Sequence, residues 1–189
     1  MNGATTVLLV DDELPIRESI ENVMRRDRRV VLLTAESGAH ALKILQERRA
    51  VEGAEVAVLI SDYQMPLMNG LELMEAVRGR YPLVIRILLS ARIDLNEVTD
   101  AFNRGLIFRF LAKPCPPEEF SAAVHAGVRA SQALIQSDNL MRRYEELKAH
   151  VEHLGRAVLA TSLALRHDSQ IAQDGELLLQ SLSGANRNG

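Results

Sequence analysis

Five short runs of β-branched residues and leucine alternate with segments of helical pattern in the first two thirds of the chain. Most positions in these runs are apolar, which is typical of strands buried on both faces of a parallel sheet. Strands that alternate with helices in this order predict an α/β fold with a doubly wound, five-stranded parallel sheet of the (βα)5 type. The runs are residues 7–10, 30–35, 56–61, 85–91 and 108–112.

Local signals predict where the helices between and after these runs begin and end. Pro15 can open a helix over residues 15–26, because proline is tolerated in a first turn. Ser37 can cap the second helix with its side-chain oxygen. The later helices are expected over residues 71–80, over residues 95–104 with a stop at Gly105, and from Pro116 onward.

Polar side chains stand at the carboxyl ends of four of the five runs. Ligands of doubly wound sheets bind at this edge, so we expect the side chains to converge there. Asp11 and Asp12 follow the first run, Asp62 follows the third, Ser90 lies in the fourth, and Lys113 follows the fifth.

Three carboxylates in one small space raise one another's pKa values, and a hard divalent cation such as Mg²⁺ relieves the conflict. The ammonium of Lys113 and the hydroxyl of Ser90 can each meet a phosphoryl oxygen. The residue types therefore favour a site at which a carboxylate accepts a phosphoryl group and forms an aspartyl phosphate.

Four motifs at these positions resemble the receiver domains of two-component response regulators. The resemblance covers residues 5–130 and implies a flavodoxin-like receiver domain, for which we expect the bounds 1–130. The motifs are Val-Asp-Asp-Glu at 10–13, Ser-Asp-Tyr-Gln-Met-Pro-Leu-Met-Asn-Gly at 61–70, Leu-Leu-Ser-Ala at 88–91 and Leu-Ala-Lys-Pro at 111–114.

The resemblance implies that Asp62 accepts a phosphoryl group from a sensor histidine kinase in a reaction that needs Mg²⁺. Asp12 and Asp62 would bind the metal through their side chains, Gln64 through its backbone carbonyl, and Asp11 through metal-bound water. The protein would act as a switch that signals to a downstream protein target. It would not be an enzyme, apart from its self-catalysed phosphorylation and dephosphorylation.

Three further residues take their expected roles from the same resemblance. Ser90 and Lys113 would contact the phosphoryl group, and the peptide bond after Lys113 would be cis. Ser90 and the aromatic residue Phe110 would form the switch that responds to phosphorylation. The alternative for Phe110 is ordinary core packing.

Beyond residue 130 the chain has no strand signal, and apolar residues recur at spacings of four and three. This heptad pattern predicts a helical coiled-coil extension over residues 131–173, followed by a flexible tail over 174–189. Valine and leucine at alternate seam positions favour a parallel homodimer. One alternative is a single amphipathic helix that folds back on its own domain. Separately, residues 137–139 shift the apolar phase and could break the helix or cap a new one. The seam residues are Leu140, Tyr144, Leu147, Val151, Leu154 and Val158.

Two other functions fit the C-terminal segment. Its helices could form a dimeric phosphotransfer or kinase-docking module around His167, or a coiled-coil adaptor that ignores phosphorylation. A phosphatase of the haloacid-dehalogenase type, by contrast, needs an Asp-x-Asp motif. At Asp62 the following residues are Tyr63 and Gln64, so this class is excluded.

Composition and charge favour a cytoplasmic protein. The net charge of −3 gives no reason to expect direct nucleic-acid binding. The single cysteine, Cys115, cannot form an internal disulfide, which fits a reducing compartment. The sequence shows no signal-peptide pattern, and the uncharged stretch between Arg156 and Arg166 is too short to cross a membrane.

Overall fold

The computed structural model describes residues 4–51, 55–91 and 95–185, and within the last range it describes side chains over residues 96–162 and at Leu177. Two compact units divide the chain, Met1–Ser137 and Asp138–Gly189. The first unit contains all the described strands and the helices between them.

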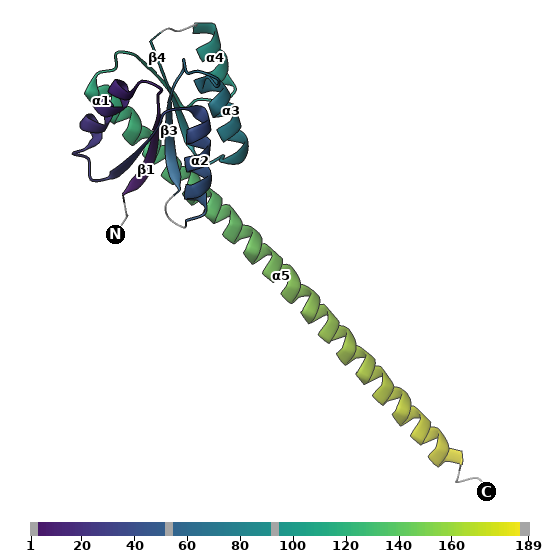
Figure 1. Ribbon diagram of the computed structural model, residues 1–189. Helices are drawn as coiled ribbons and strands as arrows, with labels where there is room; N and C mark the ends of the chain where they lie inside the picture. The colour runs from purple at the N-terminus through teal and green to yellow at the C-terminus, as the bar shows by residue number, and fades with distance from the viewer. Residues whose placement is uncertain (1–3, 52–54, 92–94, 186–189) are drawn as a thin grey trace. The chain divides into compact units, whose positions relative to one another are not determined.

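One parallel sheet of five strands forms the centre of the first unit (Figure 1). Its strand order is β2-β1-β3-β4-β5, which confirms the doubly wound α/β prediction. The strands are β1 (Thr5–Val10), β2 (Val30–Ala35), β3 (Val56–Asp62), β4 (Ile85–Ser90) and β5 (Arg109–Ala112). The helices are α1 (Leu14–Met24), α2 (Gly38–Arg49), α3 (Gly70–Arg80), α4 (Leu95–Asn103) and α5 (Pro117–Ala185).

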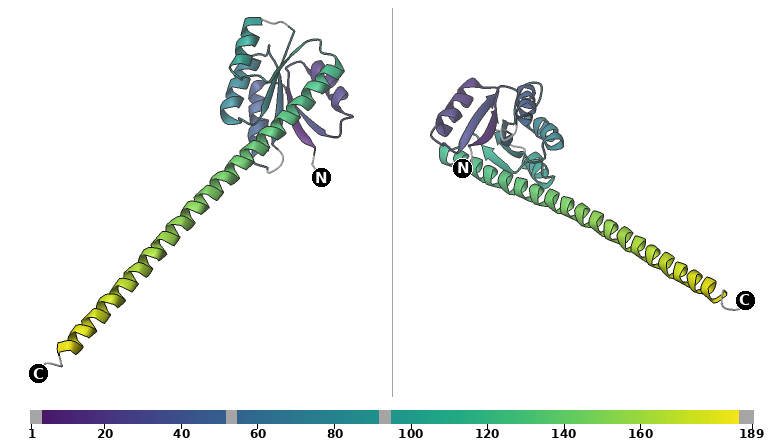
Figure 2. Two further views of the ribbon diagram at one scale, coloured as in Figure 1. Left: turned by 180° about the vertical axis from the view of Figure 1, so that it is seen from behind. Right: turned by 90° about the horizontal axis from the view of Figure 1, so that it is seen from below.

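The sheet is apolar on both faces because helices cover both (Figures 1 and 2). Val7 and Leu9 of β1 pack in one cluster with residues of α1 and of the first turns of α5. Leu8 and Val10 point the other way and pack against α2 and α3. Successive side chains of a strand alternate between faces, so an uninterrupted apolar run is what two covered faces require.

Short polar signals begin and end the helices. The hydroxyl of Ser37 accepts a hydrogen bond from the backbone N–H of His40 at 3.2 Å, as expected of the cap of α2. Asn69 and Glu72 form a reciprocal capping box at the start of α3, a signal that the sequence analysis did not use. Gly105 follows α4 with φ of +64°, a conformation that favours glycine at a helix end.

α5 continues through residues 137–139 without the break or new cap considered as an alternative. Each polar residue inside a helix lowers its stability only slightly. An ion pair between Arg142 and Asp138 at 2.9 Å adds a favourable i,i+4 contact next to this point. The helix also extends to Ala185, into the segment for which the sequence suggests a flexible tail. Within the described part of the chain, no helix has the length and apolar character needed to span a membrane.

The start of α3 lies directly against the end of β3, and Gly70 makes this possible. Its backbone N–H donates to the carbonyl oxygen of Tyr63 at 2.9 Å. A Cβ atom at Gly70 would lie 2.3 Å from the carbonyl oxygen of Asp62. The close approach fixes the loop that leaves the sheet at Asp62.

We predict that Gly70→Ala lowers the free energy of unfolding by about 1–3 kcal/mol, because the added methyl group overpacks the contact with β3. Gly79→Ala in the same helix is the matched control. A Cβ atom there meets nothing within 4 Å, so this change should stabilise the protein by about 0.5–1 kcal/mol. Urea unfolding measures both, and equal effects would contradict the packing argument.

Candidate functional site

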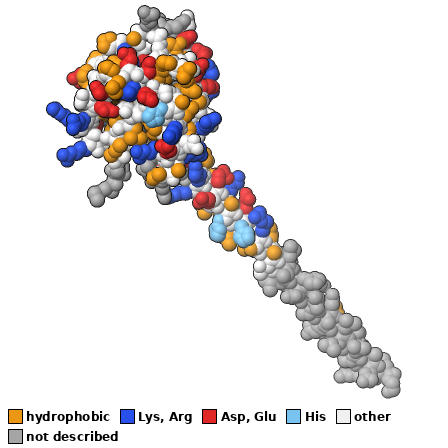
Figure 3. Space-filling view, in the orientation of Figure 1, with side chains coloured by type: hydrophobic (Ala, Val, Ile, Leu, Met, Phe, Trp, Pro, Cys, Tyr) orange, Lys and Arg blue, Asp and Glu red, His pale blue; other side chains and the backbone are white. Residues whose placement is uncertain are grey.

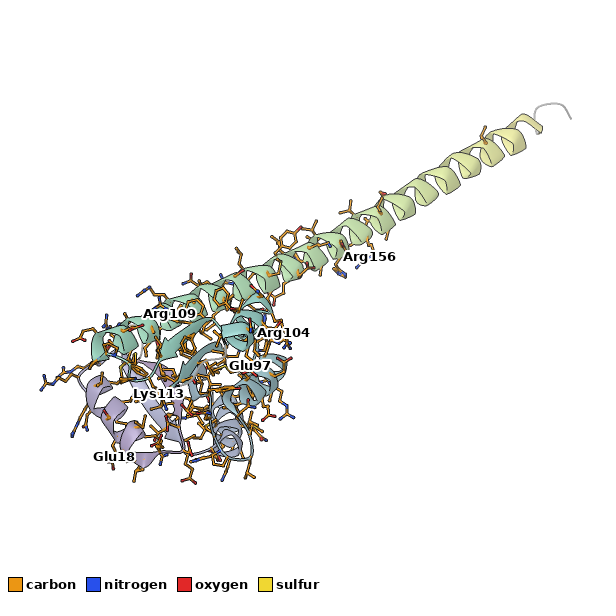
Figure 4. The ribbon with its side chains drawn as sticks, turned by 90° about the horizontal axis from the view of Figure 1, so that it is seen from above. Glu18, Glu97, Arg104, Arg109, Lys113 and Arg156 are labelled. Carbon is orange, nitrogen blue, oxygen red and sulfur yellow. The ribbon has the colours of Figure 1, made fainter. Side chains whose placement is uncertain are left out.

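The expected polar residues meet at the carboxyl edge of the sheet. Asp62 is the last residue of β3 and Ser90 the last of β4. Asp11 and Lys113 follow directly after β1 and β5. Figure 4 looks down on this edge and labels Lys113, and Figure 3 shows acidic side chains gathered over the same part of the domain.

A three-membered ion cluster forms the centre of this edge. The Nζ atom of Lys113 lies 2.6 Å from Oδ2 of Asp11 and 2.5 Å from Oδ1 of Asp62. Asp11 is 1% and Asp62 6% exposed, so both carboxylates are shielded from bulk water. One partly buried ammonium thus faces two buried carboxylates, and the two aspartates lie 51 positions apart in the sequence.

Backbone N–H groups hold the second oxygen of each carboxylate. The N–H of Glu13 donates to Oδ1 of Asp11 at 3.0 Å, and the N–H of Gln64 donates to Oδ2 of Asp62 at 2.7 Å. Each carboxylate is therefore held by a backbone donor on one side and by Lys113 on the other. This arrangement leaves the two carboxylates little freedom to turn.

The cluster shifts the pKa values of its members. Burial raises the pKa of Asp62, and the negative charge of Asp11 adds to the rise, so that together they outweigh the lowering by Lys113. Burial lowers the pKa of Lys113, but hydrogen bonds and charge from Asp11 and Asp62 more than offset it, and the net shift is upward. Lys113 therefore holds its proton more tightly than a free lysine does, and ionisation of Asp62 is less favourable than that of a free aspartate.

The donor chemistry of this edge fits a hard divalent cation. Asp12 is exposed beside the buried Asp11, so three carboxylates lie on or next to the same edge. Oxygen ligands of this kind are those that Mg²⁺ prefers. Among the described residues no group of three or more acidic, histidine or cysteine side chains is arranged around a metal position, and the ammonium of Lys113 lies between Asp11 and Asp62.

The two expected switch residues are both close to this cluster in the sheet. Ser90 is buried and pairs in register with Ala112, the residue before Lys113. Phe110 pairs with Leu88 and is only partly buried. It packs in the small hydrophobic cluster beneath α4, together with Met74, Leu88, Ala101, Leu106, Ile107, Tyr63, Leu71 and Val98. The peptide bond between Lys113 and Pro114 is cis, as the resemblance implied.

Two contacts near the site escaped the sequence analysis. The guanidinium of Arg17 in α1 donates to the backbone carbonyl of Asp11 at 2.6 Å. The hydroxyl of Tyr63, directly after Asp62, donates to the carboxylate of Glu97 in α4 at 2.6 Å. Neither contact has a sequence signal, because each joins residues whose distance is set by the packing of a helix on the sheet.

The predicted seam lies in α5, within the second unit. Its six apolar residues are each between 49% and 70% exposed, so none is covered within this chain. Such a row of exposed apolar side chains is a candidate contact surface. The residues are Leu140, Tyr144, Leu147, Val151, Leu154 and Val158. The side chain of His167 lies outside the described residues.

Comparison with known proteins gives a consistent family assignment. The family described as the response regulator receiver domain matches residues 7–125. The hydrogenase transcriptional regulatory protein HoxA of Cupriavidus necator is 29% identical over 125 residues, which are 66% of this chain and 24% of HoxA. The chain thus spans about a quarter of the length of that relative. A chemotaxis protein CheY homolog of Campylobacter jejuni is 33% identical over 114 residues, 59% of this chain and 83% of the homolog.

A solved structure gives the same result for the fold. The signal receiver domain of an HD domain-containing protein from Pseudomonas fluorescens superimposes with a TM-score of 0.62 at 28% sequence identity. The match covers 69% of this chain and 98% of that domain.

The ion cluster predicts opposite effects of two substitutions in buffer without divalent cations. Lys113→Met should lower the free energy of unfolding by on the order of 3 kcal/mol, because it leaves two buried carboxylates without their cation. Asp62→Asn should raise it by about 1 kcal/mol at pH 7, because it removes one of two carboxylates that compete for one ammonium.

The pH dependence of the free energy of unfolding is a second test of the sign of the Asp62→Asn effect. The pKa of Asp62 is raised in the folded protein, so ionisation of Asp62 costs stability as the pH rises through that pKa. The advantage of Asp62→Asn should therefore be present at neutral pH and disappear as the pH falls to the ordinary range of an aspartate. Chemical denaturation at several pH values measures it, and a destabilising Asp62→Asn at pH 7 would refute the electrostatic account.

Proposed function

Because the chain belongs to the response regulator receiver domain family of two-component systems, we propose that Asp62 accepts a phosphoryl group from a sensor histidine kinase. The observation that carries the proposal is the position of Lys113, whose ammonium lies 2.5 Å from Asp62 and 2.6 Å from Asp11 at the carboxyl edge of the sheet. A cytoplasmic location follows as part of the same proposal, since the kinase would donate its phosphoryl group there.

The transfer is a displacement at phosphorus. A carboxylate oxygen of Asp62 attacks the phosphorus atom of a phosphohistidine, the P–N bond breaks, and its electron pair returns to the imidazole nitrogen. The N–H of Gln64 holds Oδ2 of Asp62 and Lys113 meets Oδ1, so we assign Oδ1 as the attacking atom, because the phosphoryl group would then arrive beside the ammonium. Lys113 already meets Oδ1 and would pair with the phosphoryl oxygens as they arrive, stabilising them by charge and position.

The side chains of Asp12 and Asp62 and the backbone carbonyl of Gln64 would hold Mg²⁺, with Asp11 acting through metal-bound water. When bound, the ion supplies positive charge that offsets the carboxylates and the incoming phosphoryl group. The burial of Asp11 and Asp62 supports this role, because charges act more strongly where water is excluded.

Phosphorylation would be transmitted by Ser90 and Phe110. The hydroxyl of Ser90 would move to donate a hydrogen bond to a phosphoryl oxygen. Phe110 would respond within the cluster beneath α4, which it shares with Tyr63. The outcome would be an altered contact with a downstream protein and no turnover of a substrate beyond the phosphoryl group itself.

The exposed seam of α5 favours a parallel homodimer as a second element of the function. The segment carries six exposed apolar side chains at heptad spacing. An isolated helix of this kind is only marginally stable in water, and a partner helix that covers the apolar side chains would stabilise it. Valine at 151 and 158 with leucine at 147 and 154 is the pattern of two-stranded parallel coiled coils. Direct binding of nucleic acid or of a membrane is no part of this proposal.

A small-molecule phosphodonor with Mg²⁺ should label the wild-type protein on Asp62 alone. Asp62→Asn should abolish labelling, and Asp12→Ala should raise the Mg²⁺ concentration needed for half-maximal labelling by about tenfold or more. Asp138→Asn in α5 is the control and should label normally. Intact-mass spectrometry measures the phosphoryl group.

The stability of the label separates the alternatives. An aspartyl phosphate is lost in base, whereas a phosphohistidine at residue 167 survives base and is lost in acid. Labelling of Asp62→Asn at the wild-type rate, or a base-stable label, would exclude Asp62 as the acceptor.

Leu147→Asp together with Leu154→Asp should convert a dimer into monomers, because two buried carboxylates per helix cannot be paired in the seam. Ala149→Asp, on the opposite side of the helix, should leave the dimer intact. Labelling of Asp62 should be unchanged in both variants. Light scattering at micromolar concentration measures the mass, and a monomeric wild type would rule out the dimer.

A further inference from the structure

The loop that follows Asp62 is joined to α4 by a hydrogen bond between two side chains. The Tyr63 hydroxyl donates to Oε2 of Glu97 at 2.6 Å. The two residues are 34 positions apart in the sequence, and Glu97 lies in the first turn of α4. Hydrogen bonds to a charged acceptor are short and stronger than neutral ones, so this bond can hold the first turn of α4 toward the site.

The backbone of Tyr63 is fixed on both sides. Its N–H donates to the carbonyl of Leu89 at 2.8 Å, and its carbonyl accepts from the N–H of Gly70 at 2.9 Å. The Tyr63 ring packs in the same cluster as Phe110. The backbone and ring of Tyr63 are therefore held in place at the edge of the sheet, and its hydroxyl gives α4 an anchored hydrogen-bond partner.

The C-terminal end of α4 is held by a different set of contacts. Arg86 of β4 donates from Nε to the carbonyl of Leu106 at 2.7 Å and from Nη2 to that of Gly105 at 3.1 Å. Arg104 pairs with Asp100 at 3.4 Å and with Glu75 of α3 at 3.5 Å. Figure 4 labels Glu97 and Arg104, which mark the two ends of the helix.

Between these ends the described side chains of α4 make a small buried face. Ala101 is 2% exposed and Val98 is partly buried in the cluster, whereas Phe102 is 59% exposed. An element with few buried apolar contacts opens or shifts at low free-energy cost. A single charged hydrogen bond at its first turn can therefore contribute a large share of the stability of its position.

We propose that Tyr63 is a positioning residue that couples the phosphorylation site to α4, through a hydrogen bond with Glu97 that favours the unphosphorylated arrangement. This inference rests on the proposed function of Asp62. Phosphorylation would draw Ser90 toward Asp62, and the chain from Ser90 reaches the first turn of α4 within a few residues. Tyr63 stays fixed by its backbone while the first turn moves, so the bond to Glu97 is released and α4 pivots at its Arg86 end.

Linkage fixes the sign of the effect. A contact made only in the unphosphorylated arrangement stabilises that arrangement relative to the phosphorylated one. Removing the contact therefore raises the affinity for any ligand that prefers the phosphorylated arrangement. Beryllofluoride, which stands in for a phosphoryl group on Asp62, is such a ligand. Tyr63→Phe keeps the ring in its cluster and removes the hydroxyl that donates to Glu97.

The test measures beryllofluoride binding by fluorine NMR at a fixed Mg²⁺ concentration, together with amide hydrogen exchange of α4. Tyr63→Phe should raise the affinity by about three- to tenfold and speed the exchange of α4 amides in the unliganded protein. Glu97→Ala should do the same, and Glu97→Gln, which keeps an acceptor oxygen, should fall between. The double variant Tyr63→Phe with Glu97→Ala should bind beryllofluoride with the affinity of the single variants, since each single change already removes the hydrogen bond between Tyr63 and Glu97.

Tyr81→Phe is the matched control, because the Tyr81 ring lies at the end of α3 beneath the guanidinium of Arg49 and away from α4. It should leave both readouts unchanged. A general loss of structure would lower the affinity for beryllofluoride, so a rise cannot come from damage alone. An unchanged or lower affinity in Tyr63→Phe, with normal binding to the wild type, would overturn the coupling alone. Failure of the wild type to bind beryllofluoride would overturn the proposed function and the coupling with it.

Discussion

The ion cluster of Lys113 with Asp11 and Asp62 is the interaction on which the rest of the site depends. Two buried carboxylates facing one ammonium carry a net negative charge in a poorly solvated place, which is costly for a folded protein. In the proposed function the same excess of negative charge would attract Mg²⁺, and the bound cation together with Lys113 would then offset the charge of an incoming phosphoryl group. Stability in the free protein and readiness for the ligand are therefore set by the same three side chains.

The sheet makes this costly arrangement possible by fixing the backbone around it. β1, β3 and β4 are buried on both faces, and the start of α3 presses against the end of β3 at Gly70. Backbone N–H groups hold the outer oxygens of both carboxylates. The favourable packing at the strand ends thus offsets the free-energy cost of holding two carboxylates close together.

Mobility in this domain is expected where packing is thin. Few of the described side chains of α4 are buried, and polar contacts hold the helix at its two ends, at Arg86 and at Tyr63. Polar contacts of this kind can exchange partners at a modest free-energy cost, whereas a close-packed core resists partial movement. In the coupling that we propose, a change of charge at Asp62 would therefore move α4 more readily than the sheet.

The sequence alone determined the order of strands and helices, the edge at which the site lies, and the residues that form it. It did so because apolar runs identify buried strands, and because strands joined by helical crossovers run parallel, so that their carboxyl ends lie at one edge. Asp11, Asp62, Ser90 and Lys113 could be read directly from their positions at those strand ends.

The tertiary structure decided which atoms meet. The pairing of Lys113 with one oxygen of each carboxylate, the bond from Tyr63 to Glu97 and the uninterrupted path of α5 all depend on how helices settle on the sheet or on small differences in helix propensity. Distances between segments that are far apart in the chain are set by the packing of the whole domain, and no local pattern of residues records them.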